Sequence, residues 1–183
     1  MKSVGVGIVR TFVAGVLVAA IYLGSVGSAQ AAFRWYGPYF NQRVAANIFH
    51  FVNKERQKRR IPVLRRAVTW NWVATKHSIH MVRTRVFAHN SSRFPVGWRT
   101  VGQRFRQGRP IYSNYRYAEN IAWMSNYKSM SASRVGKAFV DMWMASAGHR
   151  ANILNRRLLF MGVGFQGGYA TQFFSNQPGR RIR

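Results

Sequence analysis

The chain has 183 residues, 29 of them Lys or Arg and only 3 Asp or Glu, which gives a net charge of +26 at pH 7. The absence of cysteine excludes a disulfide framework, and for an exported domain it favours a bacterial envelope over a eukaryotic secretory route. The excess of basic over acidic residues excludes a preference for cationic partners. It predicts salt-sensitive binding to polyanions such as teichoic acids, lipopolysaccharide phosphates, anionic lipids or nucleic acid, although a surface that only tolerates its charge is the alternative.

Residues 1–31 predict a secretory signal peptide. Lys2 and Arg10 supply the positive start, an apolar core of 12 residues covers 12–23, and Ala29-Gln30-Ala31 offers a cleavage site. An uncleaved membrane anchor is the alternative, although the apolar core is shorter than the ~20 residues that a spanning helix needs. Cleavage would leave one domain with two charges fewer, +24. We expect a lead-in at 32–41, the folded domain at 42–176 and a basic tail at 177–183.

The first elements in chain order are helical. Apolar side chains at helical spacing predict helices over 42–58 and 68–86, and a short helical turn is expected at 99–107. Strict alternation then predicts a strand at 117–123. On this strand Glu119 lies among large apolar side chains on one face, and Asn120 lies on the other.

A third helix and two further strands complete the expected order. The helix extends from Val135 to Ser146, and we expect Gly148 to end it in the left-handed conformation, so that His149 leaves the helix axis. Strands at 161–166 and 171–175 follow, and Gly167-Gly168 joins them.

Two groups of helical side chains could bind ligands, but a structural role is the stronger interpretation for both. His77 and His80 have an i, i+3 spacing that could chelate a metal. His77 also lies on the apolar stripe, where we expect a buried imidazole that hydrogen-bonds to the backbone, with His80 at the polar edge. The basic run 54–60 could form a polyanion site, but a solvated helix end is the simpler interpretation.

Only three acids are available for a buried carboxylate. Asp141 lies four residues after Lys137, which predicts a surface ion pair. Glu55 is expected to pair with Arg56 or Arg83. Glu119 is the functional candidate, because a carboxylate among apolar side chains is costly unless it is paired or liganded.

Motifs along the chain carry a family resemblance. The longest is Trp143-x-x-Ser146-x-Gly148-His149-Arg150-x-Asn152-Ile153-Leu154, followed by Gly162-Val163-Gly164. Before it come Asn53-x-Glu55-Arg56, His77-x-x-x-Met81, Phe87-Ala88-His89, Arg104 with Gly108, and Ala118-Glu119-Asn120-Ile121-Ala122. Over roughly Gln42 to Ser175, they resemble the bacterial branch of the CAP superfamily (cysteine-rich secretory proteins, antigen 5 and pathogenesis-related proteins). The resemblance implies an α+β fold, a three-layer α-β-α sandwich with a central antiparallel sheet.

The resemblance also implies a central cleft, in which His89 and Glu119 face one another and His149 is a third member. These three could hold a divalent metal such as zinc, but a hydrogen-bonded cluster without metal explains them as well. The family's second Glu and second His are replaced here by Ser146 and Tyr169, and we favour the cluster without metal. Four residues are expected to form the rim or support of the cleft: Ser146, Arg150, Tyr169 and Asn120.

The sequence therefore predicts an exported bacterial CAP-like protein that binds an anionic glycan or lipid at the cell envelope through this cleft. A metal-dependent hydrolase using the same cleft and a cationic membrane-active protein are the alternatives. A serine hydrolase is disfavoured, because Ser146 lies near His149 but in no nucleophile elbow. No metallopeptidase helix or sequence-specific nucleic-acid motif is present, and the oligomeric state is left open.

Overall fold

The sheet is organised around a hairpin made by the last two strands in chain order. The computed structural model describes residues 38–108, 110 and 113–180, and within them four strands form one sheet in the order β1-β3-β4-β2. β3 (Phe160–Gln166) and β4 (Tyr169–Ser175) are antiparallel, and β2 (Tyr117–Trp123) pairs antiparallel with β4. Gly167 and Gly168 join the hairpin with φ values of 55° and 85°, as a type I′ turn requires.

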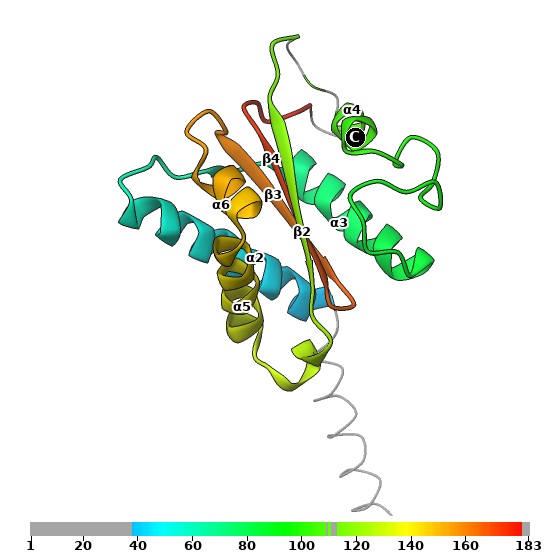
Figure 1. Ribbon diagram of the computed structural model, residues 1–183, viewed down its shortest axis with the longest axis horizontal. Coiled ribbons are helices and arrows are strands. Elements are labelled where there is room, and N and C mark those ends of the chain that lie inside the picture. The colour runs from blue at the N-terminus through cyan, green and yellow to red at the C-terminus, as the bar shows by residue number, and fades with distance from the viewer. Residues whose placement is uncertain (1–37, 109, 111–112, 181–183) are drawn as a thin grey trace, which may run out of the picture. The chain divides into compact units, whose positions relative to one another are not determined.

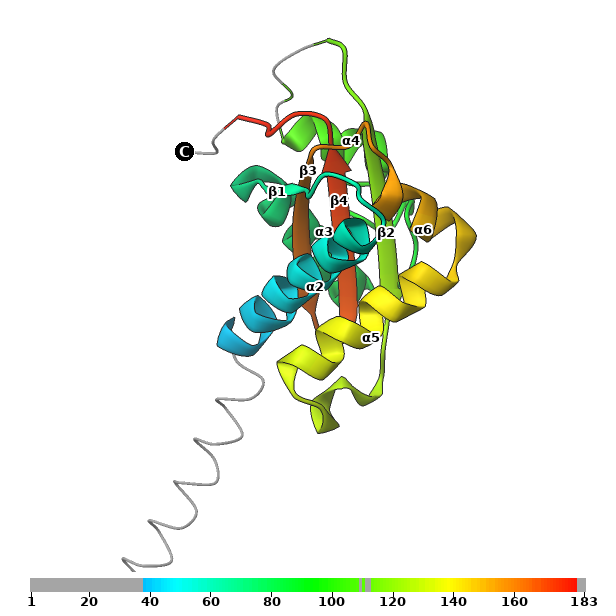
Figure 2. The same cartoon turned by 90° about the vertical axis from the view of Figure 1, so that its left-hand side faces the viewer.

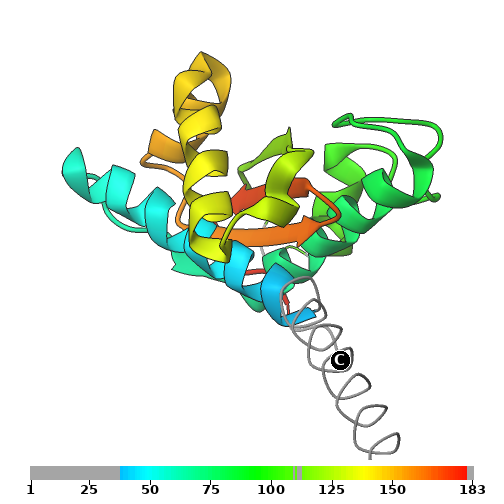
Figure 3. The same cartoon turned by 90° about the horizontal axis from the view of Figure 1, so that it is seen from below.

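Helices cover both faces of the sheet (Figure 1). α2 (Pro38–Lys58), α5 (Ala132–Ala145) and α6 (Ala147–Leu154) lie on one face, and Figure 2 shows α2 and α5 in front of the strands. α3 (Val68–Thr84) and α4 (Val101–Gln107) lie on the other face, so that Figure 3 shows the sheet between two helical layers. A short 3-10 helix, Asn126–Ser129, precedes α5. The expected three-layer α-β-α sandwich is therefore confirmed.

The larger part of the core lies between the sheet and α2 and α5. Val44, Ile48 and Val52 recur every four residues along α2 and are fully buried. Three large side chains of α5 are buried on the same side of the sheet: Val135, Phe139 and Trp143. Full burial of each such side chain contributes roughly 1.5–3 kcal/mol, so this seam fixes the two helices on the strands.

Two glycines of β3 bring α3 into direct contact with the sheet. A Cβ at Gly162 would lie 1.9 Å from the backbone carbonyl carbon of Trp70, and one at Gly164 would lie 2.3 Å from the backbone nitrogen of Thr75. Only a residue without a side chain allows this approach. As a result His77, which is fully buried on α3, reaches across to β2.

Two expectations about local structure are wrong. α5 ends at Ala145, Ser146 is extended at φ −90° and ψ 124°, and α6 then contains Gly148 in its first turn. Gly148 is not among the described glycines with positive φ, because one glycine costs a helix only about 1 kcal/mol and need not end it. The sheet is also not wholly antiparallel, since β1 (Arg65–Arg66) pairs parallel with β3.

The ends of the chain limit what can be compared with the expectations. The predicted signal segment 1–31, the lead-in up to residue 37 and residues 181–183 of the tail lie outside the described residues. The helix expected to begin at residue 42 begins at Pro38. Within the described ranges, no helix combines the length and the apolar character needed to cross a membrane.

Candidate functional site

The Glu119 carboxylate is the centre of a buried polar cluster on the α3 side of the sheet. Glu119 is 6 % exposed in the middle of β2, where pairing with β4 holds it opposite Phe173. Its Oε1 accepts a hydrogen bond from Arg104 Nη2 at 2.7 Å, and its Oε2 accepts one from Arg104 Nε at 2.8 Å. His89 Nδ1 lies 2.9 Å from Oε1. An ionised carboxylate can only accept hydrogen bonds, so His89 donates from Nδ1. Its Nε2 then remains able to bind a ligand or water.

Arg104 of α4 neutralises Glu119, and it was not among the site residues expected from the sequence. Its guanidinium is fully buried and also donates to the backbone oxygens of Trp98, at 2.8 Å, and of His89. Arg104 therefore ties β2 to the loop that carries His89. A signal for it existed, because a buried carboxylate needs a cation and Arg104 belongs to one of the motifs.

His77 closes the cluster from α3. Its Nε2 lies 3.5 Å from Glu119 Oε1, and neither ring nitrogen has a hydrogen-bond partner among the described residues. The ring packs edge-on against Phe94, with the centroids 5.2 Å apart. The expected hydrogen bond from His77 to the backbone is thus not observed. His80 is buried against Trp98 rather than at a polar edge.

The protonation states in the cluster follow from burial and charge. Burial alone would raise the pKa of the Glu119 carboxyl, but the His89 hydrogen bond and the nearby Arg104 charge lower this pKa below its ordinary value. Burial is also the main cause that lowers the pKa of His77, to about 4. At neutral pH the cluster therefore contains an ionised Glu119, a charged Arg104 and a neutral His77.

His149 does not join Glu119 as expected. Its backbone oxygen accepts a hydrogen bond from Asn120 Nδ2 at 3.1 Å, on the opposite face of β2 from the Glu119 carboxylate. Its imidazole is half-buried, and burial together with the charge of His89 lowers its pKa. The two imidazoles therefore lie within electrostatic range of each other, but only His89 contacts Glu119.

The four residues expected at the rim have different roles. Asn120 is fully buried and links β2 to α6, because it donates to Gln172 at 2.9 Å and accepts from Asn152 at 2.8 Å. Arg150 donates to the backbone oxygen of Met144 at the end of α5. Ser146 separates α5 from α6, and Tyr169 packs beside Trp123 at the hairpin.

The other two acids and one buried arginine are held elsewhere. Asp141 pairs with Lys137 at 2.6 Å, as predicted. Glu55 pairs with Lys58 and Arg59, both at 2.7 Å, so its expected pairing with Arg56 or Arg83 is wrong. Arg56 is instead turned inward, where it is 1 % exposed and donates to backbone carbonyl groups.

The described side chains do not fit a metal ion. Among them no group of three His, Cys, Asp or Glu residues is arranged to hold one. Both Glu119 oxygens already bind Arg104, whose positive charge would oppose a cation at the same carboxylate. His149 is not within reach of Glu119 as a third ligand. The arrangement is that of a hydrogen-bonded cluster in which Glu119 is satisfied by Arg104 and His89, while the His77 nitrogens have no described partner.

Comparison with known proteins gives one family match. Residues 49–176 match the model of the cysteine-rich secretory protein family, CAP. None of the curated proteins compared matches this chain. The solved structure of an extracellular protein containing an SCP domain, from Bacillus anthracis, is 28 % identical with a TM-score of 0.63, and the match covers 75 % of this chain and 41 % of that one.

Two more distant structures share the fold. A cysteine-rich secretory protein from Staphylococcus aureus is 17 % identical with a TM-score of 0.54, over 75 % of this chain and 39 % of that one. An outer surface protein from Borrelia burgdorferi is 17 % identical with a TM-score of 0.53, over 70 % of this chain and 89 % of that one. The chain thus spans less than half of the Bacillus and Staphylococcus structures and most of the Borrelia one.

Proposed function

Because the chain belongs to the cysteine-rich secretory protein (CAP) family, we propose that it is an exported protein of the bacterial envelope that binds an anionic glycan or lipid. Binding takes place where His89 and His149 flank β2, with Glu119 and Arg104 as the buried support. The export of the chain is supported by its similarity to the Bacillus anthracis protein, which is described as extracellular. The polymer or lipid would come from the envelope itself.

The observation that carries this proposal is the saturation of the Glu119 carboxylate. A general base or nucleophile needs an accessible lone pair, and a general base works best with a pKa near the operating pH. Glu119 has two hydrogen-bonded oxygens, is buried, and has a lowered pKa. The Ser146 hydroxyl is not hydrogen-bonded to any described base, as a nucleophile would require. These features favour recognition over hydrolysis.

The sign of the ligand follows from the charges. The side chains that reach the surface here are the imidazole of His89, with 41 % of it exposed, and that of His149. An anion suits this place, because imidazole nitrogens can donate hydrogen bonds to it and the chain has 29 basic residues against 3 acids. Burial and the charge of His89 lower the pKa of His149 in the absence of a ligand, and an anion that contacts this imidazole would favour its protonated form, so we expect binding to be stronger at about pH 5.5 than at about pH 7.5.

The test measures binding of the full chain to two anionic probes. Polygalacturonate is titrated by calorimetry, and vesicles of phosphatidylglycerol are compared with vesicles of phosphatidylcholine in a pelleting assay, at pH 7.5 and pH 5.5. The double variant His89→Gln, His149→Gln should lose at least tenfold in affinity for the probe that binds. The matched control is His50→Gln, which removes an exposed imidazole from α2 and should have no effect.

Two results would contradict the proposal. Equal binding by the wild type and the double variant would assign the affinity to the general positive charge. Zinc binding with micromolar or higher affinity that is lost in the double variant would show that His89 and His149 bind a metal. This result would contradict the conclusion that the described side chains do not fit a metal ion.

A further inference from the structure

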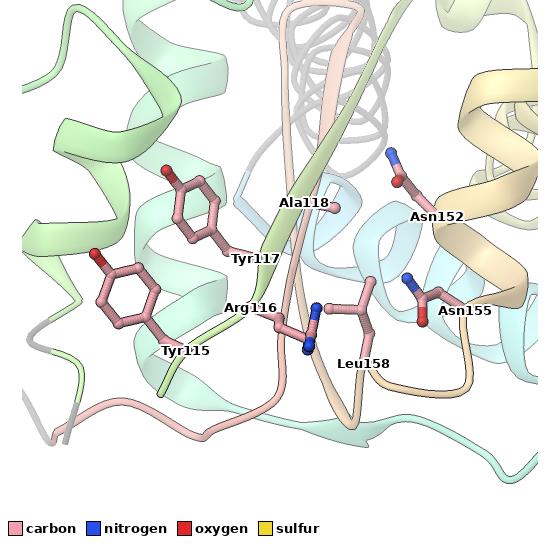
Figure 4. Close-up of a pocket in the computed structure, with 7 residues that line it drawn as sticks. All are labelled: Tyr115, Arg116, Tyr117, Ala118, Asn152, Asn155 and Leu158. Atoms are coloured by element: carbon pink, nitrogen blue, oxygen red, sulfur yellow. The ribbon is translucent and has the colours of Figure 1, made fainter. Parts of the chain in front are cut away.

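A pocket lies between the start of β2 and the end of α6 (Figure 4). Asn152 in its lining donates to Asn120, so the pocket is on the face of β2 opposite to the Glu119 carboxylate. It has a volume of about 360 Å³, which is at the small end of the range for ligand pockets. Its walls are the start of β2, the end of α6 and the loop before β3. The lining residues are Tyr115, Arg116, Tyr117, Ala118, Asn152, Asn155 and Leu158. Because side chains alternate along a strand, the side chains of Arg116 and Ala118 face the pocket. The side chains of Tyr117 and Glu119 point to the other face of β2, although Tyr117 is among the residues that line the pocket.

The Arg116 guanidinium has no counter-ion in the described part of the chain. All three acids are engaged elsewhere: Glu55 with Lys58, Glu119 with Arg104, and Asp141 with Lys137. Arg116 is exposed, and no described group accepts a hydrogen bond from its side chain. Arg156 and Arg157, also exposed, follow Asn155 at the pocket edge and raise the positive potential there. An arginine in this setting suits a carboxylate or a phosphate supplied by a ligand.

Both walls of the pocket are held in place before any ligand arrives. Arg56 lies behind the loop wall and donates to the backbone oxygens of Ile153 at 2.7 Å and of Asn155 at 3.0 Å. On the other wall, the backbone nitrogen of Arg116 donates to Asn176 at 2.9 Å. A pocket fixed in this way loses little conformational entropy on binding, which favours even a small ligand.

The other residues that line the pocket indicate which chemical groups the ligand carries besides its anionic group. Asn152 uses its Nδ2 and Asn155 its Oδ1 for bonds within the protein, so that one amide oxygen and one amide nitrogen have no described partner. This acceptor and donor match hydroxyl groups. Tyr115 and Tyr117 point to the other side of β2 in Figure 4, and the centroid of each ring lies 4.6 Å from that of Phe105. Neither of these rings is therefore available to stack on a nucleobase in the pocket. Ala118 and Leu158 alone are too little apolar surface for an acyl chain.

We propose that this pocket binds a single acidic sugar unit, with Arg116 on its carboxylate or phosphate and the Asn152 and Asn155 amides on its hydroxyl groups. The proposal does not depend on the function proposed above, because neither His89 nor His149 lines this pocket. It adds a second point of attachment for an anionic glycan.

The test is a titration of the isotope-labelled full chain, followed by NMR, with glucuronic acid, glucose 6-phosphate and uncharged glucose. At least one of the two acidic sugars should shift the backbone amide signals of 116–118 and 155–158, and the one that does identifies the anion. Glucose should bind at least tenfold more weakly. Arg116→Gln should weaken binding at least tenfold, whereas Arg134→Gln, which removes an exposed charge from α5, should change it less than twofold.

Each contrary result is distinct. Equal losses in Arg116→Gln and Arg134→Gln would show a general electrostatic effect and overturn the pocket. Shifts confined to residues near His89 would also overturn it while supporting the other site. The variant His89→Gln, His149→Gln should bind the acidic sugar normally here, so a failure of the proposed function leaves this test readable.

Discussion

Replacement of Arg104 by methionine should be among the most destabilising single changes in the protein. Arg104 supplies the positive charge for Glu119 and two hydrogen bonds to backbone oxygens in the loop of His89. Removing one partner of a buried ion pair costs about 3–5 kcal/mol, because the other charge stays buried without compensation. The two lost backbone contacts add about 1 kcal/mol each.

A double-mutant cycle separates these contributions. Glu119→Leu alone leaves Arg104 buried without its carboxylate and should cost about 3 kcal/mol or more. In the double variant Arg104→Met, Glu119→Leu no charge is left, so only the backbone contacts should be missing and the loss should fall to about 2 kcal/mol. The measurement is urea unfolding with linear extrapolation. The stability loss of the double variant could instead equal the sum of the losses of the two single variants to within about 0.5 kcal/mol. That result would refute the idea that the two charges stabilise each other.

Two further predictions concern pH and glycine. Because the pKa of His77 is about 4 in the folded state, against an ordinary 6.5, the unfolded chain takes up this proton first as the pH falls. The free energy of unfolding should drop by about 2 kcal/mol between pH 7 and pH 5 through His77, and urea unfolding of His77→Gln should lack this part. Gly148→Ala should leave the melting temperature unchanged or raise it, since nothing lies within 4 Å of the new methyl group. Gly162→Ala should cost about 3 kcal/mol, because its Cβ would lie 1.9 Å from the Trp70 backbone; equal melting temperatures for the two alanine variants would contradict this packing.

The elements with a clear local pattern could be predicted from the sequence. The strand 117–123 has the predicted ends, because large and small side chains alternate through it without interruption. The hairpin was marked by Gly167-Gly168, two residues that accept positive φ. The observed helix break at Ser146 lies two residues before the predicted break at Gly148, because a single glycine costs a helix little and does not by itself end it. β1 was missed because Arg65 and Arg66 have no strand pattern and depend on pairing with β3, some 95 positions later.

The candidate site was predicted less completely, and for a related reason. The strand pattern placed Glu119 among apolar side chains, and the family motifs added His89. Local helix and strand patterns do not single out the main cation among the 29 basic residues, and the motif that contains Arg104 is the one signal for it. Arg104 and Arg56 are buried only because distant segments surround them, and a basic residue in a short helix or a charged run ordinarily faces solvent.

The strand order has a consequence for how the protein is made. The two strands at the centre of the sheet, β3 and β4, follow every other described element in the chain, and each of β1 and β2 pairs with one of them. While the chain is being synthesised, α2 and α3 have no sheet to pack against until residue 175 has emerged. Pairings of such long range are slow to form. A domain that cannot complete its sheet until its last strands are made is suited to passage through a narrow membrane channel before it folds, as the proposed export would require.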